Sequence, residues 1–465
     1  MARSRWTLCA AVLGLAGCVS LAPDYQRPEA PVPKQWPDTA AGAPAPADRV
    51  STLAWRAFFG DEHLQQLIEQ ALANNRDLRF AVLNVERARG LYGIQRGELY
   101  PSFSASASAA RLHESADLVQ PGQSRTASQY SVDLGLAAWE IDFFGRLRNL
   151  SQQALEEFFA TEAAQRATHL AIVAEVARAY YTLAADQELL QLVRSTLESQ
   201  QEAYNLVKRR FEVGLATELD LKRAQTPLEV ARADLARTTQ QVALDVNALV
   251  LLLGGGVTPA PLPQGLSVVT PPREIEAGLS SEVLLDRPDI VAAEHRLKGA
   301  YAAIGAARAT LFPRISLTAS VGTASNELAG LFESGTGTWA FVPQLALPIF
   351  DTRLWAAIRV RESERALALN DYERSIQVAF REVADALAVQ KNIGQQLDAQ
   401  QAVVAAAADT YRLALRRYQQ GIDNYLSVLD AQRALFAAQQ QLIVLRLEKI
   451  VNQSRLYAVL GGGAE

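Results

Sequence analysis

The apolar positions of this chain follow a seven-residue repeat through two long segments that almost lack helix-breaking residues. Residues 146–213 contain neither Gly nor Pro, and residues 349–420 contain no Pro and the single Gly394. In the first segment, apolar residues recur every seven positions, at Val176, Leu183, Leu190, Leu197, Tyr204 and Phe211. This spacing predicts long α-helices that wind around neighbouring helices as coiled coils.

A shorter helical segment follows each long one, at residues 215–253 and 422–460. Pro227 lies inside the first of these and is expected to bend or restart the helix. A helix over residues 146–213 would be about 100 Å long at the usual rise of about 1.5 Å per residue. A helix of that length must pack along another long helix, in this chain or in a second copy.

The two halves of the chain resemble each other. With a shift of 207 positions, the segment from Tyr204 to Gly214 matches the segment from Tyr411 to Gly421 in Tyr, Leu, Arg-Arg, aromatic and Gly positions. This self-similarity predicts two structural repeats, residues 61–253 and 282–465, each with a pair of long helices (146–253 and 352–460). A Gly- and Pro-rich linker, residues 254–281, joins them.

Between the helical segments, apolar and polar residues alternate with a period of two. The pattern predicts one β-hairpin at about residues 102–143 and a second at about 314–350, each with one apolar and one polar face. The alternation slips by one position at Ala137-Ala138, which predicts a β-bulge.

The predicted hairpins have two interpretations. They form either a small sheet packed on the helices of a soluble protein, or part of a membrane-spanning barrel. Four strands cannot close a membrane barrel, because about eight is the smallest number seen, and an open edge in lipid leaves backbone groups unpaired. If the strands span a membrane, several chains must share one barrel. A conducting lumen requires three or more, since eight-stranded barrels are filled by side chains.

The N-terminus has the features of an export signal. Residues 1–17 combine Arg3 and Arg5 with a short apolar run, and Leu15-Ala16-Gly17-Cys18 resembles the bacterial lipoprotein box. Cys18 would then be the lipidated first residue of the mature chain. The alternative is an ordinary secretory signal with an incidental Cys. Val19 rather than Asp follows the Cys, which favours the outer membrane, and residues 18–60 are expected to be an extended, Pro-rich, lipidated segment.

Composition and motifs exclude several function classes. The formal net charge of −5 gives no basic face for nucleic acid, and 49% hydrophobic residues exclude general disorder. No zinc-protease, phosphate-loop, dinucleotide or nucleophile-elbow motif occurs, so we expect neither an enzyme nor a cofactor beyond the covalent lipid. The acidic pair Glu156-Glu157 is expected on a solvated helix face.

Several longer motifs carry a family resemblance that covers essentially the whole mature chain. They are the mature N-terminus with Cys18, Pro23, Tyr25, Arg27 and Pro28, and the segments Trp139–Arg146, Arg287–Ile290, Leu347–Asp351, Arg417–Gly421 and Leu429–Arg433. Together they resemble the outer-membrane efflux lipoproteins, TolC-like exit ducts of tripartite drug pumps.

The resemblance implies a mainly α fold with a small β part. It implies a homotrimer in the outer membrane of a Gram-negative bacterium, with a shared twelve-stranded β-barrel and a periplasmic α-barrel. The partners would be outer-membrane lipid, a periplasmic adaptor protein and a proton-driven inner-membrane pump. The function would be passive conduction of drugs or other small molecules to the exterior.

The resemblance also places a gate at the periplasmic ends of the long helices. It makes Leu426 and Asp430 the constriction, with latch candidates at Asp423, Arg417, Tyr418 and Arg433. Three copies of Asp430 around one axis would repel one another and favour cations. The first repeat carries Ala216 and Arg223 at the positions of Asp423 and Asp430, so only the second repeat would line the constriction.

Alternatives stay open from the sequence. The duct could serve protein secretion or metal-ion export, although the mature chain has no Met for a thioether copper route. The chain could also be a coiled-coil envelope lipoprotein without a pore. The proposed gate residues could simply be solvated helix-end residues that form ordinary ion pairs.

Overall fold

The computed structural model describes residues 20–36, 53–255, 262–275 and 280–463. The predicted signal peptide and Cys18 lie outside the described residues. The chain divides into two compact units: one contains residues up to 29, 84–162 and 292–372, and the other contains residues 30–83, 163–291 and 373–465. Each unit draws on both halves of the chain, so the units do not coincide with the two repeats defined by the sequence.

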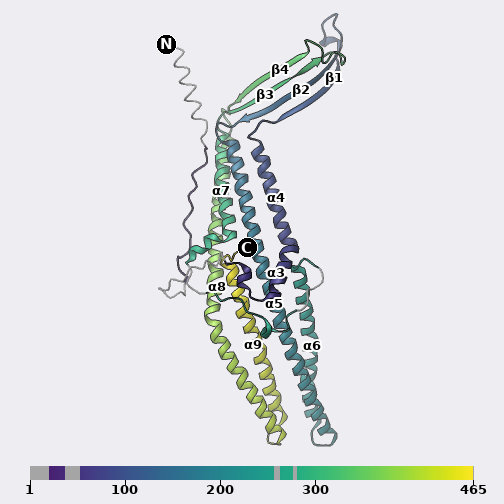
Figure 1. The fold of residues 1–465 in the computed structure, drawn as a ribbon, viewed down its shortest axis with the longest axis vertical. Coiled ribbons are helices and arrows are strands. Elements are labelled where there is room, and N and C mark those ends of the chain that lie inside the picture. Colours follow the sequence, from purple (N-terminus) through teal and green to yellow (C-terminus); the bar gives the residue numbers. More distant parts are fainter. Residues whose placement is uncertain (1–19, 37–52, 256–261, 276–279, 464–465) are drawn as a thin grey trace. The chain divides into compact units, whose positions relative to one another are not determined.

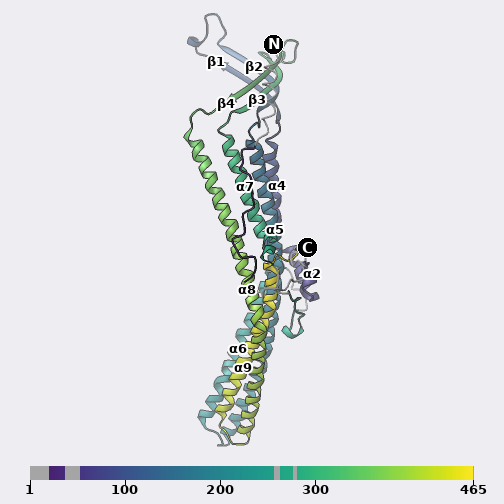
Figure 2. The same cartoon turned by 90° about the vertical axis from the view of Figure 1, so that its left-hand side faces the viewer.

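The first unit contains a single antiparallel sheet, which Figure 2 shows with its four strands side by side. Its strands are β1 (Phe103–His113), β2 (Thr126–Ile141), β3 (Arg314–Ser325) and β4 (Gly337–Ala346), in the order β1-β2-β3-β4. A short 3₁₀ turn, η2 (Ala116–Leu118), lies between β1 and β2. All residues of β1 and β4 are exposed.

The strand register places apolar residues from all four strands in one stripe on the same face. Leu134 is opposite Ala105 on β1 and Val321 on β3, and Val321 is in turn opposite Trp339 on β4. Residues directly opposite each other share a face, so an apolar stripe crosses the sheet. The neighbouring positions, including Asp133, Ser320 and Gly322, form the polar face.

The predicted bulge is confirmed at Ala137-Ala138. Leu136 is opposite Ala319 and Trp139 is opposite Leu317, so β2 advances three residues while β3 advances two. Ala138 has a positive φ of 46°, the one non-Gly residue with such a value in the described chain. The extra residue returns Trp139 to the apolar face, which a regular strand would have turned to the polar face.

Helices occupy most of the remaining chain (Figure 1). The two longest are α5 (Arg146–Glu212) and α8 (Thr352–Gln419), followed by α6 (Glu218–Leu252) and α9 (Tyr425–Val459). The others are α2 (Trp55–Phe58), α3 (Glu62–Asn74), α4 (Arg76–Gly97) and α7 (Pro288–Ala309), with 3₁₀ turns η3 (Leu266–Val268) and η4 (Ser281–Asp286). Val176 and Leu183 of the seven-residue repeat are fully buried.

Two details of the expected helices differ in the structure. Of the two outcomes expected at Pro227, a bend or a restart, the restart does not occur: α6 continues through Pro227, with Ala224 and Leu228 buried on either side. Packing of these neighbours offsets the one backbone hydrogen bond that Pro removes. The segment 18–60 is also not extended throughout, because α2 forms within it. Phe58 of that helix stacks on the buried ring of Tyr457 with ring centroids 4.3 Å apart.

A third expectation fails at Glu156, which is buried rather than solvated. Its carboxylate accepts hydrogen bonds from the amide of Gln152 (2.8 Å), and Nδ1 of His295 on α7 lies 2.7 Å from its second oxygen. A carboxylate is buried only when such partners replace water. The sequence pattern around Glu156 does not predict this burial, because α7, which covers the side chain, comes from a distant part of the sequence.

The N-terminal segment of the first unit packs on α7. Tyr25 Oη donates a hydrogen bond of 3.1 Å to Glu294, and Arg27 and Lys298 form ion pairs with the same carboxylate. Burial would raise the pKa of Glu294, but the hydrogen bonds from the two cations outweigh it and hold that pKa below its usual value. The carboxylate therefore stays charged and fixes the segment to the helix.

Within the described residues, no helix has a stretch long and apolar enough to cross a membrane.

Candidate functional site

The turns that follow α5 and α8 have the same backbone design. After α8, Gly421 adopts a φ of 75°, its N–H donates to the carbonyl of Tyr418 (3.0 Å), and the N–H of Ile422 donates to that of Arg417 (2.9 Å). After α5, Gly214 has a φ of 78° and equivalent hydrogen bonds. A Gly in the left-handed region is the usual way to end a helix with its carbonyls paired.

An ion pair bridges the second turn. Arg417 Nε lies 2.6 Å from Asp423 Oδ2, and Arg417 Nη2 lies 3.1 Å from Asp423 Oδ1. The hydrogen bonds from Arg417 lower the pKa of Asp423, and Asp423 raises the pKa of Arg417 in return. The pair joins the end of α8 to the segment before α9, where it can hold the turn closed.

The first turn lacks this ion pair, because its position equivalent to Asp423 is Ala216. Arg210, the equivalent of Arg417, instead places its guanidinium carbon 5.3 Å from the ring centroid of Tyr418. A cation over an aromatic face is attracted by the ring quadrupole. The two turns of the second unit are therefore linked through Arg210 and Tyr418.

A small apolar core supports the two turns. It consists of the buried residues Val207, Ala224, Tyr425, Val428 and Leu429, with Tyr418 packed against it. The rings of Tyr418 and Tyr425 lie 5.1 Å apart, and the Tyr425 hydroxyl is buried without a hydrogen-bond partner among the described residues. Burial raises the pKa of Tyr425 to about 12.

The two constriction candidates lie on the other side of α9. Leu426 is 40% exposed, and the carboxylate side chain of Asp430, one turn further along, is 61% exposed. Positions four apart on a helix share a face. Arg433 Nη1 lies 3.5 Å from Asp430 Oδ1, so this acid has a weak, solvated partner on its own helix.

The structure thus brings five of the six gate candidates into specific contacts: Arg417 with Asp423, Tyr418 with the core, and Asp430 with Arg433. Leu426 is exposed beside them. Sequence reasoning missed Arg210 and Tyr425. Arg210 could have been found in the sequence. It matches Arg417 in the duplicated motif, but position 216, which matches Asp423, is Ala, so Arg210 needs a different partner.

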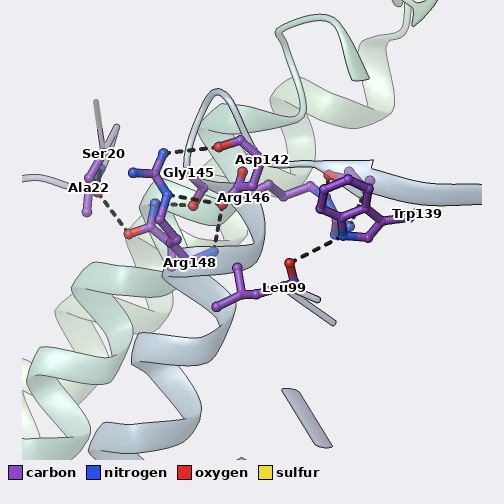
Figure 3. Close-up of polar contacts among 10 residues, drawn as sticks. Ser20, Ala22, Leu99, Trp139, Asp142, Gly145, Arg146 and Arg148 are labelled. Carbon is purple, nitrogen blue, oxygen red and sulfur yellow. Dashed lines mark hydrogen bonds and ion pairs between the residues drawn. The ribbon is translucent and has the colours of Figure 1, made fainter. Parts of the chain in front are cut away.

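A second cluster of charged residues lies where β2 ends and α5 begins (Figure 3). We call Glu140, Asp142, Arg146, Arg148 and Arg314 the collar. The guanidinium of Arg146 binds both oxygens of Glu140 at 2.8 Å, and Arg314 Nε lies 2.6 Å from the same carboxylate. Arg148 binds Asp142 at 3.3 Å through Nε.

Two further hydrogen bonds lie beside the collar, one to a backbone carbonyl and one between side chains (Figure 3). Trp139 Nε1 donates to the carbonyl of Leu99 at 3.3 Å. Ser20 donates to the Asn149 side chain at 2.9 Å, which places the N-terminal segment beside the first turn of α5. These contacts tie the segment before β1 and the N-terminal segment to the junction of β2 and α5.

In the described part of the chain, no three His, Cys, Asp or Glu side chains gather where they could hold a metal ion.

Comparison with known proteins identifies the family of this chain. A model of the outer membrane efflux protein family matches residues 67–255 and 279–462. The chain belongs to the outer membrane efflux protein family. The family model matches each half of the chain in turn, as the repeat in the sequence does.

Relatives and solved structures agree with the family assignment. The chain is 48% identical to the antibiotic efflux pump outer membrane protein ArpC of Pseudomonas putida, over 100% of this chain and 96% of the relative. It is 41% identical to the cation efflux system protein CusC of Escherichia coli, over 97% of each chain. The open-state MtrE outer membrane channel of Neisseria gonorrhoeae superposes with a TM-score of 0.86 at 37% identity, covering 96% and 99% of the two chains.

These findings confirm the predicted family, fold class and location. The efflux protein is an outer-membrane channel component of an efflux pump, built mainly from long helices with a small antiparallel sheet. The soluble-sheet interpretation and the pore-free lipoprotein are thereby set aside.

Proposed function

We propose that three copies of this chain assemble into one exit duct, with their sheets closed into a twelve-stranded barrel in the outer membrane. The observation that carries this proposal is the sheet itself. Its face across all four strands is apolar, while β1 and β4 each pair with only one strand among the described residues. Backbone groups at such edges must be paired in lipid, and a neighbouring copy supplies the partner strand.

The proposed duct continues into the periplasm through the long helices. The exposed faces of these helices pack against those of neighbouring copies, and the turns at Gly214 and Gly421 form the inner end. A periplasmic adaptor would dock on this assembly and connect it to a proton-driven inner-membrane pump. The channel itself conducts passively.

Lipidation of Cys18 would anchor each chain beside the barrel. Ser20 lies two residues after Cys18 and is held at the first turn of α5. The attached acyl chains would thus start close to the point where the strands leave the membrane, and several chains together give stable anchoring.

The gate in this proposal lies at the turns of the second unit. Leu426 and Asp430 project from the exposed face of α9 and form the constriction ring. Asp423, Arg417, Tyr418 and Arg433 act as the latch, because their contacts hold the turn before α9 in one position. Opening would require the Arg417–Asp423 ion pair and the contact between Arg210 and Tyr418 to separate.

The proposed cargo is drugs or other small organic molecules. Relatives at 48% identity are described as antibiotic and toluene efflux proteins. Metal-ion export is the second candidate, since the relative CusC is described as a cation efflux protein and the proposed ring is acidic. Growth inhibition by antibiotics and by copper or silver salts, compared with and without this chain, separates the two.

Single-channel conductance of the purified protein in planar bilayers tests the duct and the gate together. We expect Asp430→Ala to raise the conductance or open probability several-fold. The matched control is Asp409→Ala, which removes an equally exposed acid paired with Arg412 three residues later on α8. Absence of any channel, or an equal effect of both variants, would reject the proposed gate, and a solubilised assembly of other than three chains would reject the proposed trimer.

A further inference from the structure

A cavity of about 570 Å³ lies at the collar, within the first unit. Its wall is formed by the end of β2, the segment before β3 and the segment between β4 and α8. One part of the wall is apolar and includes Phe144 and Phe312, whose rings stack with centroids 4.9 Å apart. The other part is charged and contains the collar residues Glu140, Asp142, Arg146 and Arg314, together with Asp351. The cavity is therefore amphipathic and of the size that ligand sites usually have.

The collar has an unused hydrogen-bonding group that faces this cavity. Glu140 is buried and serves two guanidiniums, those of Arg146 and Arg314. Arg146 binds it through two parallel hydrogen bonds, whereas Arg314 approaches it with Nε, at 2.6 Å. Neither terminal amino group of Arg314 donates a hydrogen bond to another described residue, and its side chain is 59% exposed.

An exposed apolar segment adjoins the cavity. Leu347 lines the cavity, and Ile349 and Phe350, which follow it after β4, are 87% and 88% exposed. Large apolar side chains with this exposure seldom stand in water as a group. In the proposed barrel these residues, which follow directly after β4, lie at the level where acyl chains meet headgroups.

We propose that this cavity binds a glycerophospholipid, with the phosphate on the free amino groups of Arg314. Two N–H groups of one guanidinium match two oxygens of a phosphate diester, and the flat fork holds them more specifically than an ammonium would. The glycerol and the first acyl carbons lie against the Phe144–Phe312 wall, and the chains run along Leu347, Ile349 and Phe350. The site rests on the proposed function, in which the collar lies at the periplasmic surface of the outer membrane.

The buried carboxylate gives the site its orientation. Glu140 pairs with Nε of Arg314, which leaves the two terminal amino groups for a ligand. Arg146 neutralises Glu140, and the other two acids of the wall are paired as well, Asp142 with Arg148 and Asp351 with Arg353, so Arg314 supplies the charge that attracts the phosphate. Arg314 is thus a preorganised phosphate ligand, and Arg146 and Glu140 are positioning residues.

Native mass spectrometry of the delipidated assembly, titrated with palmitoyl-oleoyl phosphatidylethanolamine, tests the site. We expect a saturable non-covalent adduct of one lipid per chain, and a loss of affinity of about tenfold or more in Arg314→Gln, which removes a charge-assisted pair of hydrogen bonds. Arg314→Lys keeps the charge without the fork and should recover only part of the affinity.

The matched control is Arg361→Gln, which removes a charge from α8 at a position outside the cavity wall. The Arg361 side chain is 45% exposed, and its Nη1 binds Glu364 on the same helix at 2.7 Å. We expect this variant to bind the phospholipid as the unaltered protein does. An equal loss in both variants would mean that general surface charge holds the lipid, and would overturn the proposal.

Two further probes separate the sources of binding. Diacylglycerol with the same chains should bind at least about tenfold more weakly, since it lacks the phosphate. Inorganic phosphate at millimolar concentration should not displace the phospholipid, because it lacks the apolar contacts. Equal binding of diacylglycerol, or displacement by phosphate alone, would overturn the proposal. Conductance measured on the same Arg314→Gln sample shows whether the duct is intact, so failure of this site is distinguishable from failure of the proposed channel.

Discussion

The substitution Gly305→Ala on α7 should displace the N-terminal segment from that helix, because the added methyl group has no room. A Cβ added there would lie 2.7 Å from Ala22 Cβ, 2.7 Å from Ala22 N and 2.7 Å from Asn149 Nδ2. Ala22 contributes backbone, which cannot rotate away, and Asn149 is held by its hydrogen bonds to Gly145 and Ser20. In Gly305→Ala, the N-terminal segment must therefore move off the helix.

The repeat in the sequence supplies a matched control. Gly93 on α4 is the counterpart of Gly305 at a shift of 212 positions, and no described atom lies within 4 Å of a Cβ placed there. Both substitutions gain about 1 kcal/mol of helix propensity. That gain cancels in the comparison, so the difference between the variants is the overpacking cost, about 1–3 kcal/mol.

Hydrogen exchange of residues 20–27, followed by mass spectrometry, measures this difference locally. If the cost falls on the N-terminal segment, its amides should exchange about five- to 150-fold faster in Gly305→Ala than in Gly93→Ala. The melting temperature should also be lower in Gly305→Ala. Unchanged exchange of residues 20–27 in Gly305→Ala, or equal acceleration in both variants, would refute the reasoning.

Three other outcomes are expected. Arg417→Ala and Asp423→Ala should each increase channel opening, and the double variant should add little to either, because both remove one ion pair; additive effects in bilayer recordings would contradict this pairing. Cys18→Ser should abolish lipidation, so the intact mass of the variant should lack the mass of the attached acyl chains; equal masses, apart from the Cys-to-Ser difference, would count against the lipid anchor. The buried Tyr425 hydroxyl stays neutral in the folded state to about pH 12, whereas it ionises near pH 10 when unfolded, so its contribution to stability is lost as pH rises from about 10 to 12. Tyr425→Phe should remove that part of the alkaline loss in a thermal-unfolding series, and an identical loss in both proteins would show that another group is responsible.

The sequence alone determined the elements that depend on local rules. Gly and Pro end helices and the seven-residue repeat sustains them, so α5 and α8 begin and end within a few residues of the segments that these signals mark. Alternation identified the strands, and the slipped alternation at Ala137-Ala138 identified the bulge. The gate candidates came from the resemblance to the efflux family, and the duplicated motif, whose two copies differ at positions 216 and 423, assigned them to the second repeat.

Tertiary structure decided which side chains on these elements meet. Glu156 and His295 come from helices far apart in the sequence, and their contact buries an acid that periodicity would leave in water. The link between Arg210 and Tyr418 and the collar around Glu140 arise in the same way. Periodicity fixes which face of a helix or strand a residue occupies, because that depends only on backbone geometry. What covers that face depends on contacts between distant segments, and those contacts decide which charges are paired and which, like the terminal amino groups of Arg314, remain free.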